Sequence, residues 1–481
     1  MRAWLENLWR WASSGFLFLP GLSLIAAVAA AILMPMADQH LGGRTPAALH
    51  TTPETARSTL SALCSAMFTV TGVVFSTTIV ALSITSAQLG PRLLRNFLRQ
   101  KTPQLALACC LASSVYCLLL LRSVDQVDDS IFVPHLSVTL AGILGVATLI
   151  VIVFYIHTVA HSMQAQNVVS DVADDLDDAI QRLFPKSLHA EGGSDDHDAD
   201  GDEPQQSSAA SQGAEPWLAA WESLDDLDKQ TVLSHGDGYV QAIDEPGLSA
   251  AAARGDGVIR ILARPGDYVR EGEPLAEICR RDGFDDDDDH SQLASSFILG
   301  NSRTTQQDVE CAINELAEIA LRALSPGVND PFTAVACIDR LSGTLRRLAC
   351  REMPSGLVRD DEGNVRIVVR PRRFERILAA AFNQIRQSAT GNVAVQIRLL
   401  DALKAIGVAA DRRADRVAVL RQAEIIQRAA VADQLGEADR ADVLQAFGAL
   451  EEAVTRRRDP AAVYAAAKSS HPDAGQAAAT M

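Results

Sequence analysis

The sequence predicts a membrane α-helical protein, in which four transmembrane helices precede a cytoplasmic α+β portion with a small barrel-sandwich-like β module and a helical bundle. Three observations predict this fold class. Long apolar stretches are confined to the first 160 residues, short strands of alternating character lie at 238–278, and helical spacing returns after residue 304. The 481-residue chain has a net charge of −17, which argues against a nucleic-acid partner because such proteins show a basic face.

Four stretches contain no Asp, Glu, Lys or Arg and approach the length of about 20 helical residues that crosses a hydrocarbon core. They cover about 15–36, 60–86, 105–121 and 133–156, within a predicted transmembrane domain of residues 1–162. The first stretch is too long for the apolar core of a signal peptide, and further spans follow it.

Basic residues between the second and third stretches set the predicted orientation. Arg92, Arg95, Arg99 and Lys101 occur there without an acidic residue. Because Lys and Arg favour cytoplasmic loops, we expect both termini of this multi-pass inner-membrane protein to be cytoplasmic. The three arginines alternate with apolar residues at helical spacing, which is typical of an interfacial helix that contacts the lipid bilayer, anionic lipid included. A topology determinant without lipid specificity is the simpler alternative.

The second stretch carries small and hydroxyl-bearing residues on one helical stripe. The members of this hydroxyl stripe are Ser61, Ser65, Thr69, Gly72, Ser76 and Ser83. Such residues allow close helix packing and interhelical hydrogen bonds, which is the commoner cause of these stripes. They could also line a narrow polar path through the membrane. A second line, which includes Thr71 and Thr78, runs beside the stripe.

The residues behind the spans divide by composition. Residues 163–189 predict an acidic helical stalk that continues the fourth span, and residues 190–216 predict a disordered acidic insert because almost no large apolar side chain occurs there. Residues 230–282 predict the small β module. Its stretch Pro265–Leu275 resembles the hairpin of biotinyl and lipoyl domains, but the module contains no lysine, which excludes attachment of a prosthetic group. No cofactor is expected.

The remaining chain predicts an acidic linker at 283–304, a cytoplasmic helical bundle at 305–467 and a frayed tail at 468–481. The sequence predicts the structure of one loop in the bundle. Pro and Gly end one helix, Asp330 is placed to cap the next helix, and Pro331 suits the first position of that helix. The candidate structural or anion-binding loop comprises Ser325, Gly327, Asn329 and Asp330.

Signatures of metal binding and catalysis are weak. The eight cysteines include no C-x-x-C pair, so we interpret them as reduced thiols and expect no metal site. His157 and His161 share a helix face and could bind a metal or sense pH, although interfacial packing is the commoner role. The sequence contains no H-E-x-x-H, no G-x-S-x-G and no phosphate-cradling glycine loop, so an enzyme is not expected.

Three motifs occur in order along the chain. They are Val74–Leu82 with Gln88–Leu98, the strand pair that ends in Pro265–Val269, and Gln307–Glu310 followed by Ile319–Pro331. Together they resemble the domain of unknown function 2254 family, a set of predicted bacterial membrane proteins. Cys311-Ala312 departs from the pattern, where an aromatic residue followed by glycine is expected. The resemblance implies a membrane location and a bacterial source, and it implies no established activity, substrate or cofactor.

Two functions follow as hypotheses. The first is a homo-oligomeric channel or transport-like assembly with a cytoplasmic regulatory domain, because four spans with so few polar groups cannot easily form a pore in a monomer. The alternative is a membrane-tethered sensor or scaffold whose cytoplasmic portion binds a partner.

Overall fold

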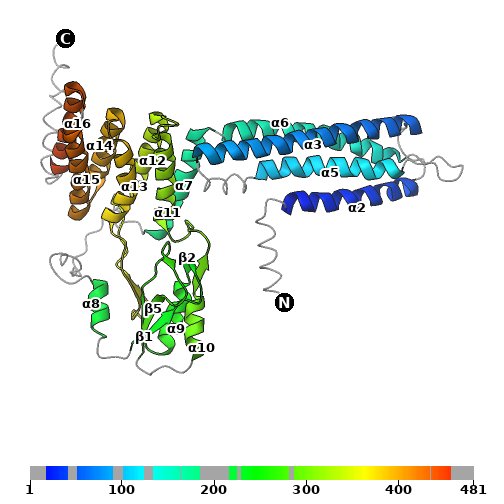
Figure 1. Cartoon of the computed structure of the whole chain (residues 1–481). Helices are drawn as coiled ribbons and strands as arrows, with labels where there is room; N and C mark the ends of the chain where they lie inside the picture. Colours follow the sequence, from blue (N-terminus) through cyan, green and yellow to red (C-terminus); the bar gives the residue numbers. More distant parts are fainter. Residues whose placement is uncertain are drawn as a thin grey trace, which may run out of the picture. The chain divides into compact units, whose positions relative to one another are not determined.

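The structure is a computed structural model whose described residues form two compact units, Met1–Val168 and Val169–Met481 (Figure 1). The described residues are 18–41, 51–89, 101–123, 134–162, 164–184, 216–224, 229–280, 287–433 and 435–456. The predicted disordered insert lies almost entirely outside them, and so does the predicted tail.

Unit 1 contains four helices that are long and apolar enough to cross a membrane. They are α2 (Phe18–Leu41), α3 (Pro53–Leu89), α5 (Lys101–Ser123) and α6 (His135–Ser162). Helices α3 and α5 include the whole of the second and third predicted stretches. Helices α2 and α6 begin a few residues after the start of the first and fourth stretches, and all four helices end beyond the predicted boundary. Helix α3 has 37 residues and is therefore about 55 Å long.

Helix α5 lies at the centre of unit 1, since half of its apolar stretch is buried, a larger share than in the other three helices. Hydroxyl pairs join the helices: Thr78 of α3 bonds to Tyr155 of α6 at 2.6 Å, and Ser113 of α5 bonds to Thr148 of α6 at 2.6 Å. At one end the carboxylate of Asp38 accepts hydrogen bonds from the backbone at the start of α6. These contacts fix the helices in one arrangement.

Helix α7 (Ala165–Leu183) does not continue α6, because α6 ends at Ser162 and the chain bends before Ala165. Its apolar face, which includes Leu176 and Ile180, is buried in unit 2. Asp177 on its other side pairs with Arg347 of α12. The segment expected to be a stalk extended from the fourth span is thus a separate helix, and its residues from Val169 onward belong to unit 2.

Unit 2 contains two small sheets. The strands are β1 (Lys229–Leu233), β2 (Gly238–Ile243), β3 (Val258–Ile261), β4 (Tyr268–Val269), β5 (Pro274–Cys279), β6 (Phe297–Gly300), β7 (Leu357–Arg359) and β8 (Val365–Val369). One sheet has the order β1-β5-β3-β8-β7 and the other β4-β2-β6. All neighbours are antiparallel except β3 and β8, which are parallel. A sheet region is therefore present, and its barrel-sandwich-like form is not confirmed.

Two segments differ from the sequence-based expectation. The range 283–304, expected to be an acidic linker, includes helix α10 (Asp287–Ser295) and strand β6, because Leu293 and Phe297 are buried in the sheet core. The range 357–369 lies within the expected helical bundle, where the alternation of Val365, Ile367 and Val369 predicts a strand. That strand is confirmed as β8, but β8 and its partner β7 belong to the sheet and not to the bundle. Ile367 is completely buried and contacts that same core, which explains why β8 joins the sheet.

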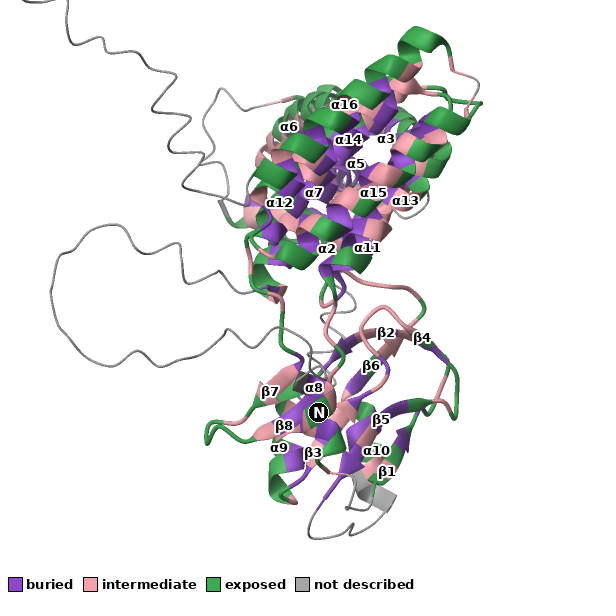
Figure 2. Ribbon diagram, turned by 90° about the vertical axis from the view of Figure 1, so that its left-hand side faces the viewer, coloured by how far each residue is buried: buried purple, intermediate pink, exposed green. Residues whose placement is uncertain are grey.

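The helices of unit 2 complete the fold. Beside the sheets lie α8 (Pro216–Glu222) and α9 (Glu245–Arg254). The bundle contains α11 (Val309–Ala323), α12 (Pro331–Ala349), α13 (Phe374–Ser388), α14 (Val393–Ala409), α15 (Arg413–Ala432) and α16 (Glu437–Arg456). Figure 2 shows their buried faces turned inward and exposed residues on the outside. The joint between the sheets and the bundle is formed where α11 and α13 begin, and it holds the charged residues described next.

Candidate functional site

The hydroxyl stripe of α3 lies on the outside of unit 1, since all six of its residues are exposed. A side chain added at Gly72 would meet nothing within 4 Å. The neighbouring line behaves differently, because Thr71 contacts Ser114 of α5 and Thr78 is buried against α6. The two lines thus have opposite environments. The residues Thr71 and Thr78 contact neighbouring helices, whereas the hydroxyl stripe lies on the outer surface of unit 1.

The other predicted residues are placed as follows. Arg92, Arg95 and Arg99 lie outside the described residues. His157 and His161 have ring centroids 6.3 Å apart, and Nδ1 of His161 bonds to Asn167. Within the part of the chain that the structure describes, no three or more metal-ligating side chains gather.

The loop before α12 is built as the sequence indicates. The carboxylate of Asp330 accepts hydrogen bonds from the backbone N–H of Thr333 at 3.2 Å and from its hydroxyl at 2.5 Å, and Pro331 begins the helix. The hydroxyl of Ser325 donates to the carbonyl of Arg322, and Asn329 has a positive φ of 48°. A Cβ atom added at Gly327 would meet nothing within 4 Å. The carboxylate of Asp330 already occupies this helix N-terminus, which disfavours an added anion there.

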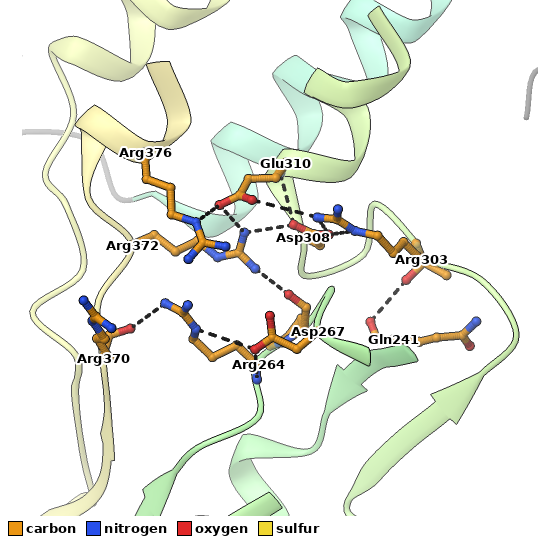
Figure 3. Close-up of polar contacts among 11 residues, drawn as sticks. Gln241, Arg264, Asp267, Arg303, Asp308, Glu310, Arg370, Arg372 and Arg376 are labelled. Carbon is orange, nitrogen blue, oxygen red and sulfur yellow. Dashed lines mark hydrogen bonds and ion pairs between the residues drawn. The ribbon is translucent and has the colours of Figure 1, made fainter. Parts of the chain in front are cut away.

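A second cluster, which the sequence reasoning missed, lies at the joint between the sheets and the bundle (Figure 3). Asp308 is 1% exposed and caps α11 by accepting from the N–H of Glu310. Its carboxylate also accepts from Nε of Arg303 at 2.8 Å and from Nη1 of Arg372 at 2.8 Å. One buried carboxylate therefore joins the loop after β6, the start of α11 and the segment before α13.

Glu310, two residues after Asp308, extends this cluster. Its carboxylate lies 3.1 Å from Nε of Arg376 and 3.6 Å from Nη1 of Arg372. Burial acts to lower the pKa of Arg303, but the charge of Asp308 and the hydrogen bond to it outweigh burial, so the pKa is raised. Two carboxylates are thus held by three arginines. Removing the charge of any one of these five side chains would deprive a buried or partly buried partner of an opposite charge and would destabilise the joint.

Beside this joint is a cavity of about 210 Å³, which we call the arginine cavity. It is lined by Arg264, Arg370, Pro371, Arg372, Arg373, Glu375, Arg376 and Ala379. Burial lowers the pKa of Arg264, and the charges of Arg372, Arg376 and Arg370 lower it further against the opposing effect of Asp267. Positive charge is therefore concentrated in this cavity beyond what the nearby carboxylates neutralise.

A signal for the arginine cavity was present in the sequence. Arg370, Arg372, Arg373 and Arg376 occur within seven residues of a strongly acidic chain, in a stretch without lysine. The fifth member, Arg264, follows strand β3 and is far away in sequence. The spacing of residues along the chain does not show that Arg264 lies near the other four arginines. The pairing of β3 with β8 brings them together.

Comparison with known proteins gives the family. The sequence profile described as "Predicted membrane protein (DUF2254)" matches residues 13–405. Uncharacterized proteins of Mycobacterium bovis and Mycobacterium tuberculosis are each 30% identical over 409 residues, which cover 84% of this chain and 74% of the relative. No solved structure matches the chain. With four apolar helices and a match over most of its length, this chain belongs to the domain of unknown function 2254 family of predicted membrane proteins.

Proposed function

We propose that the protein is a homo-oligomeric, channel or transport-like membrane assembly in which the hydroxyl stripe of α3 meets other copies of the chain. The exposure of all six stripe residues carries this proposal. Small residues on a helix surface allow another helix to approach closely, and hydroxyls can then bond across the contact or line a path between copies.

The interior of one copy offers less support for a path. Leu60, Tyr116 and Leu120 pack together between the helices. The inward hydroxyls of Thr78 and Ser113 are already bonded to α6. A polar path is therefore better supported between copies than within one. In this proposal the C-terminal portion is cytoplasmic and regulatory, both termini lie on the cytoplasmic side of a bacterial inner membrane, and the bilayer is the surrounding partner.

The test replaces two stripe residues by bulky ones. Gly72→Leu with Ser76→Leu leaves a single copy intact, because both positions are exposed, but blocks close approach of another α3. Val73→Leu is the matched control, since Val73 is also exposed and lies off the stripe. Light scattering in a mild detergent is expected to give an oligomer for the parent and the control, and a monomer for the double variant. A monomeric parent would refute the proposal.

A second candidate, a membrane-tethered sensor, is favoured by the arginine cavity. The cavity is lined by residues of the sheet part and of α13, so an occupant would contact both. A sensor also requires that occupancy changes unit 1. Disulfide crosslinking between copies through Ser76→Cys, measured with and without pyrophosphate, tests this requirement, with Val73→Cys as control. Equal crosslinking yields in both conditions would count against the sensor.

A further inference from the structure

We infer that the arginine cavity binds a phosphate group, carried either by a small soluble molecule or by a lipid headgroup. This inference rests on the sensor function proposed above and names the ligand class of that sensor.

The residues that line the cavity favour an anionic ligand. Five arginines and one glutamate line it, in a chain whose net charge is −17. The glutamate, Glu375, is 56% exposed at its side chain and already lies 3.3 Å from Arg421 of α15. The positive charge is therefore a local feature and not a property of the whole surface. Around the cavity the guanidinium groups of the described residues outnumber the carboxylates beside them, which are Asp267, Asp308, Glu310 and Glu375. An anion in the cavity therefore reduces the repulsion among the arginines.

Three of the five arginines, each from a different part of the fold, are held in place by contacts of their guanidinium groups to carboxylates or carbonyls. Arg264 follows β3, and its Nη1 donates to the backbone carbonyl of Arg370 at 3.3 Å. Arg372 is held by Asp308 and by the carbonyl of Pro265 at 2.6 Å. Arg376 lies in the first turn of α13 and is held by Glu310. Side chains positioned in advance lose less entropy when a ligand binds.

The start of α13 adds to the attraction. This 15-residue helix begins at Phe374, and its N-cap, Arg373, provides no side-chain hydrogen bond to the first turn. The contrast with α11 and α12, whose N-caps are Asp308 and Asp330, is informative. Those two helices have a capping carboxylate at the positive end of the helix dipole, whereas the N-cap of α13 is an arginine and the acidic residue of its first turn, Glu375, lies beside Arg421. An external anion can take the place of the missing carboxylate.

Size and donor geometry narrow the anion to a phosphate group. The cavity volume of about 210 Å³ is below the ~300 Å³ at which pockets for drug-sized ligands begin. The guanidinium fork donates two parallel hydrogen bonds and matches the oxygens of phosphate. A compact phosphate or diphosphate therefore fits the wall better than a large organic ligand.

The experiment uses the full chain in nanodiscs of neutral phosphatidylcholine, with pyrophosphate as the probe and calorimetry as the readout. We expect saturable binding that is at least about tenfold weaker in the variant Arg370→Gln/Arg373→Gln, because the variant removes two of the five guanidinium groups that can donate charge-assisted hydrogen bonds to the anion. Arg428→Gln is the matched control, since this arginine is 73% exposed on α15 and distant in sequence from the cavity. The control is expected to bind as the parent does.

A second set of nanodiscs, containing anionic phosphatidylglycerol, distinguishes the two sources. A headgroup in the cavity would compete with pyrophosphate in the parent and not in the double variant, whereas a soluble ligand would leave the parent affinity unchanged. Either result supports a phosphate site. The melting temperature of the double variant, and binding by the single variant Arg370→Gln, separate loss of binding from loss of folding.

Absence of saturable binding by the parent would overturn the inference, and so would equal affinity in parent and double variant. Equal weakening by Arg428→Gln would do the same. A different result would contradict the sensor function alone. In that case pyrophosphate would bind as expected, but the yield of disulfide crosslinks at Ser76→Cys would be the same with and without pyrophosphate.

Discussion

Units 1 and 2 use polar side chains in different ways. In the apolar middle of unit 1, interhelical contacts are made by neutral hydroxyls, such as Thr78 with Tyr155 at 2.6 Å. At the joint of unit 2, the contacts are between full charges, with Asp308 held by Arg303 and Arg372. Charges are expensive in hydrocarbon, whereas hydroxyls can always return to the carbonyl one turn back. The comparison indicates that fixed geometry comes from many weak contacts in unit 1 and from a few strong ones in unit 2.

The largest expected effect is at Asp308. Asp308→Asn keeps the cap atom that accepts from α11 but removes the charge that Arg303 and Arg372 share, so two arginines lose their buried partner. We expect unit 2 to lose about 3–5 kcal/mol of unfolding free energy. Proteolysis of the detergent-solubilised chain in a urea series measures it. The control is Asp339→Asn, whose pair with Arg398 is exposed and contributes about 0–1 kcal/mol. An equal loss of unfolding free energy in both variants would contradict the view that a few strong charged contacts at the joint hold unit 2.

A smaller effect is expected in unit 1 for Thr78→Val. The substitution keeps the shape of the side chain and removes the hydrogen bond to Tyr155. Interhelical hydrogen bonds in membranes contribute about 0.6 kcal/mol on average, and about 1.7 at most, so the loss should fall within this range. Unfolding of the purified protein by increasing SDS measures it. Thr77→Val, at an exposed neighbouring position, serves as the control. A loss as large as that expected for Asp308→Asn would show that unit 1 also depends on single contacts.

Thiol chemistry sharpens the comparison within unit 2. Burial raises the pKa of Cys337 to about 12, whereas Cys350 at the end of the same helix is exposed. At pH 8 we expect iodoacetamide to modify Cys350 within minutes and Cys337 only after unfolding, because the thiolate is the reactive species. Mass spectrometry of the two peptides gives the rates. Comparable rates would mean that the bundle opens readily and that its charged joint does not hold it closed.

The smallest expected effect concerns pH. Burial raises the pKa of Asp415 in α15 above its ordinary value near 3.8, with Arg412 acting in the opposite direction. An acid with a raised pKa in the folded state binds protons more tightly there than in the unfolded chain. Its contribution to stability therefore falls as the pH rises from about 3.8 through the raised pKa. The difference in unfolding free energy between parent and Asp415→Asn, measured from pH 4 to 7, should show this slope. A difference that is flat across the range would contradict it.

The sequence predicted the spans well because the requirement of a hydrocarbon core is local and depends on composition alone. The loop at Asp330 and Pro331 was equally readable, since a helix cap involves only neighbouring residues. The direction of the hydroxyl stripe could not be predicted, because periodicity shows which residues share a face and not which face is inside. The arginine cavity was missed because Arg264 reaches the others through the fold and not through a motif.

The parallel pairing of β3 with β8 also constrains the order of events during synthesis. Ile259 pairs with Ile367, so roughly a hundred residues must leave the ribosome before the five-stranded sheet can close, which takes about 5–20 s at ordinary translation rates. Until then one edge of β3 has no partner strand, and an unpaired edge is a template for wrong pairings. Helices α11 and α12, which lie between the two strands in the chain, are made during that interval. A nascent chain stalled before β8 should therefore be a substrate for chaperones, and one stalled well after β8 should not.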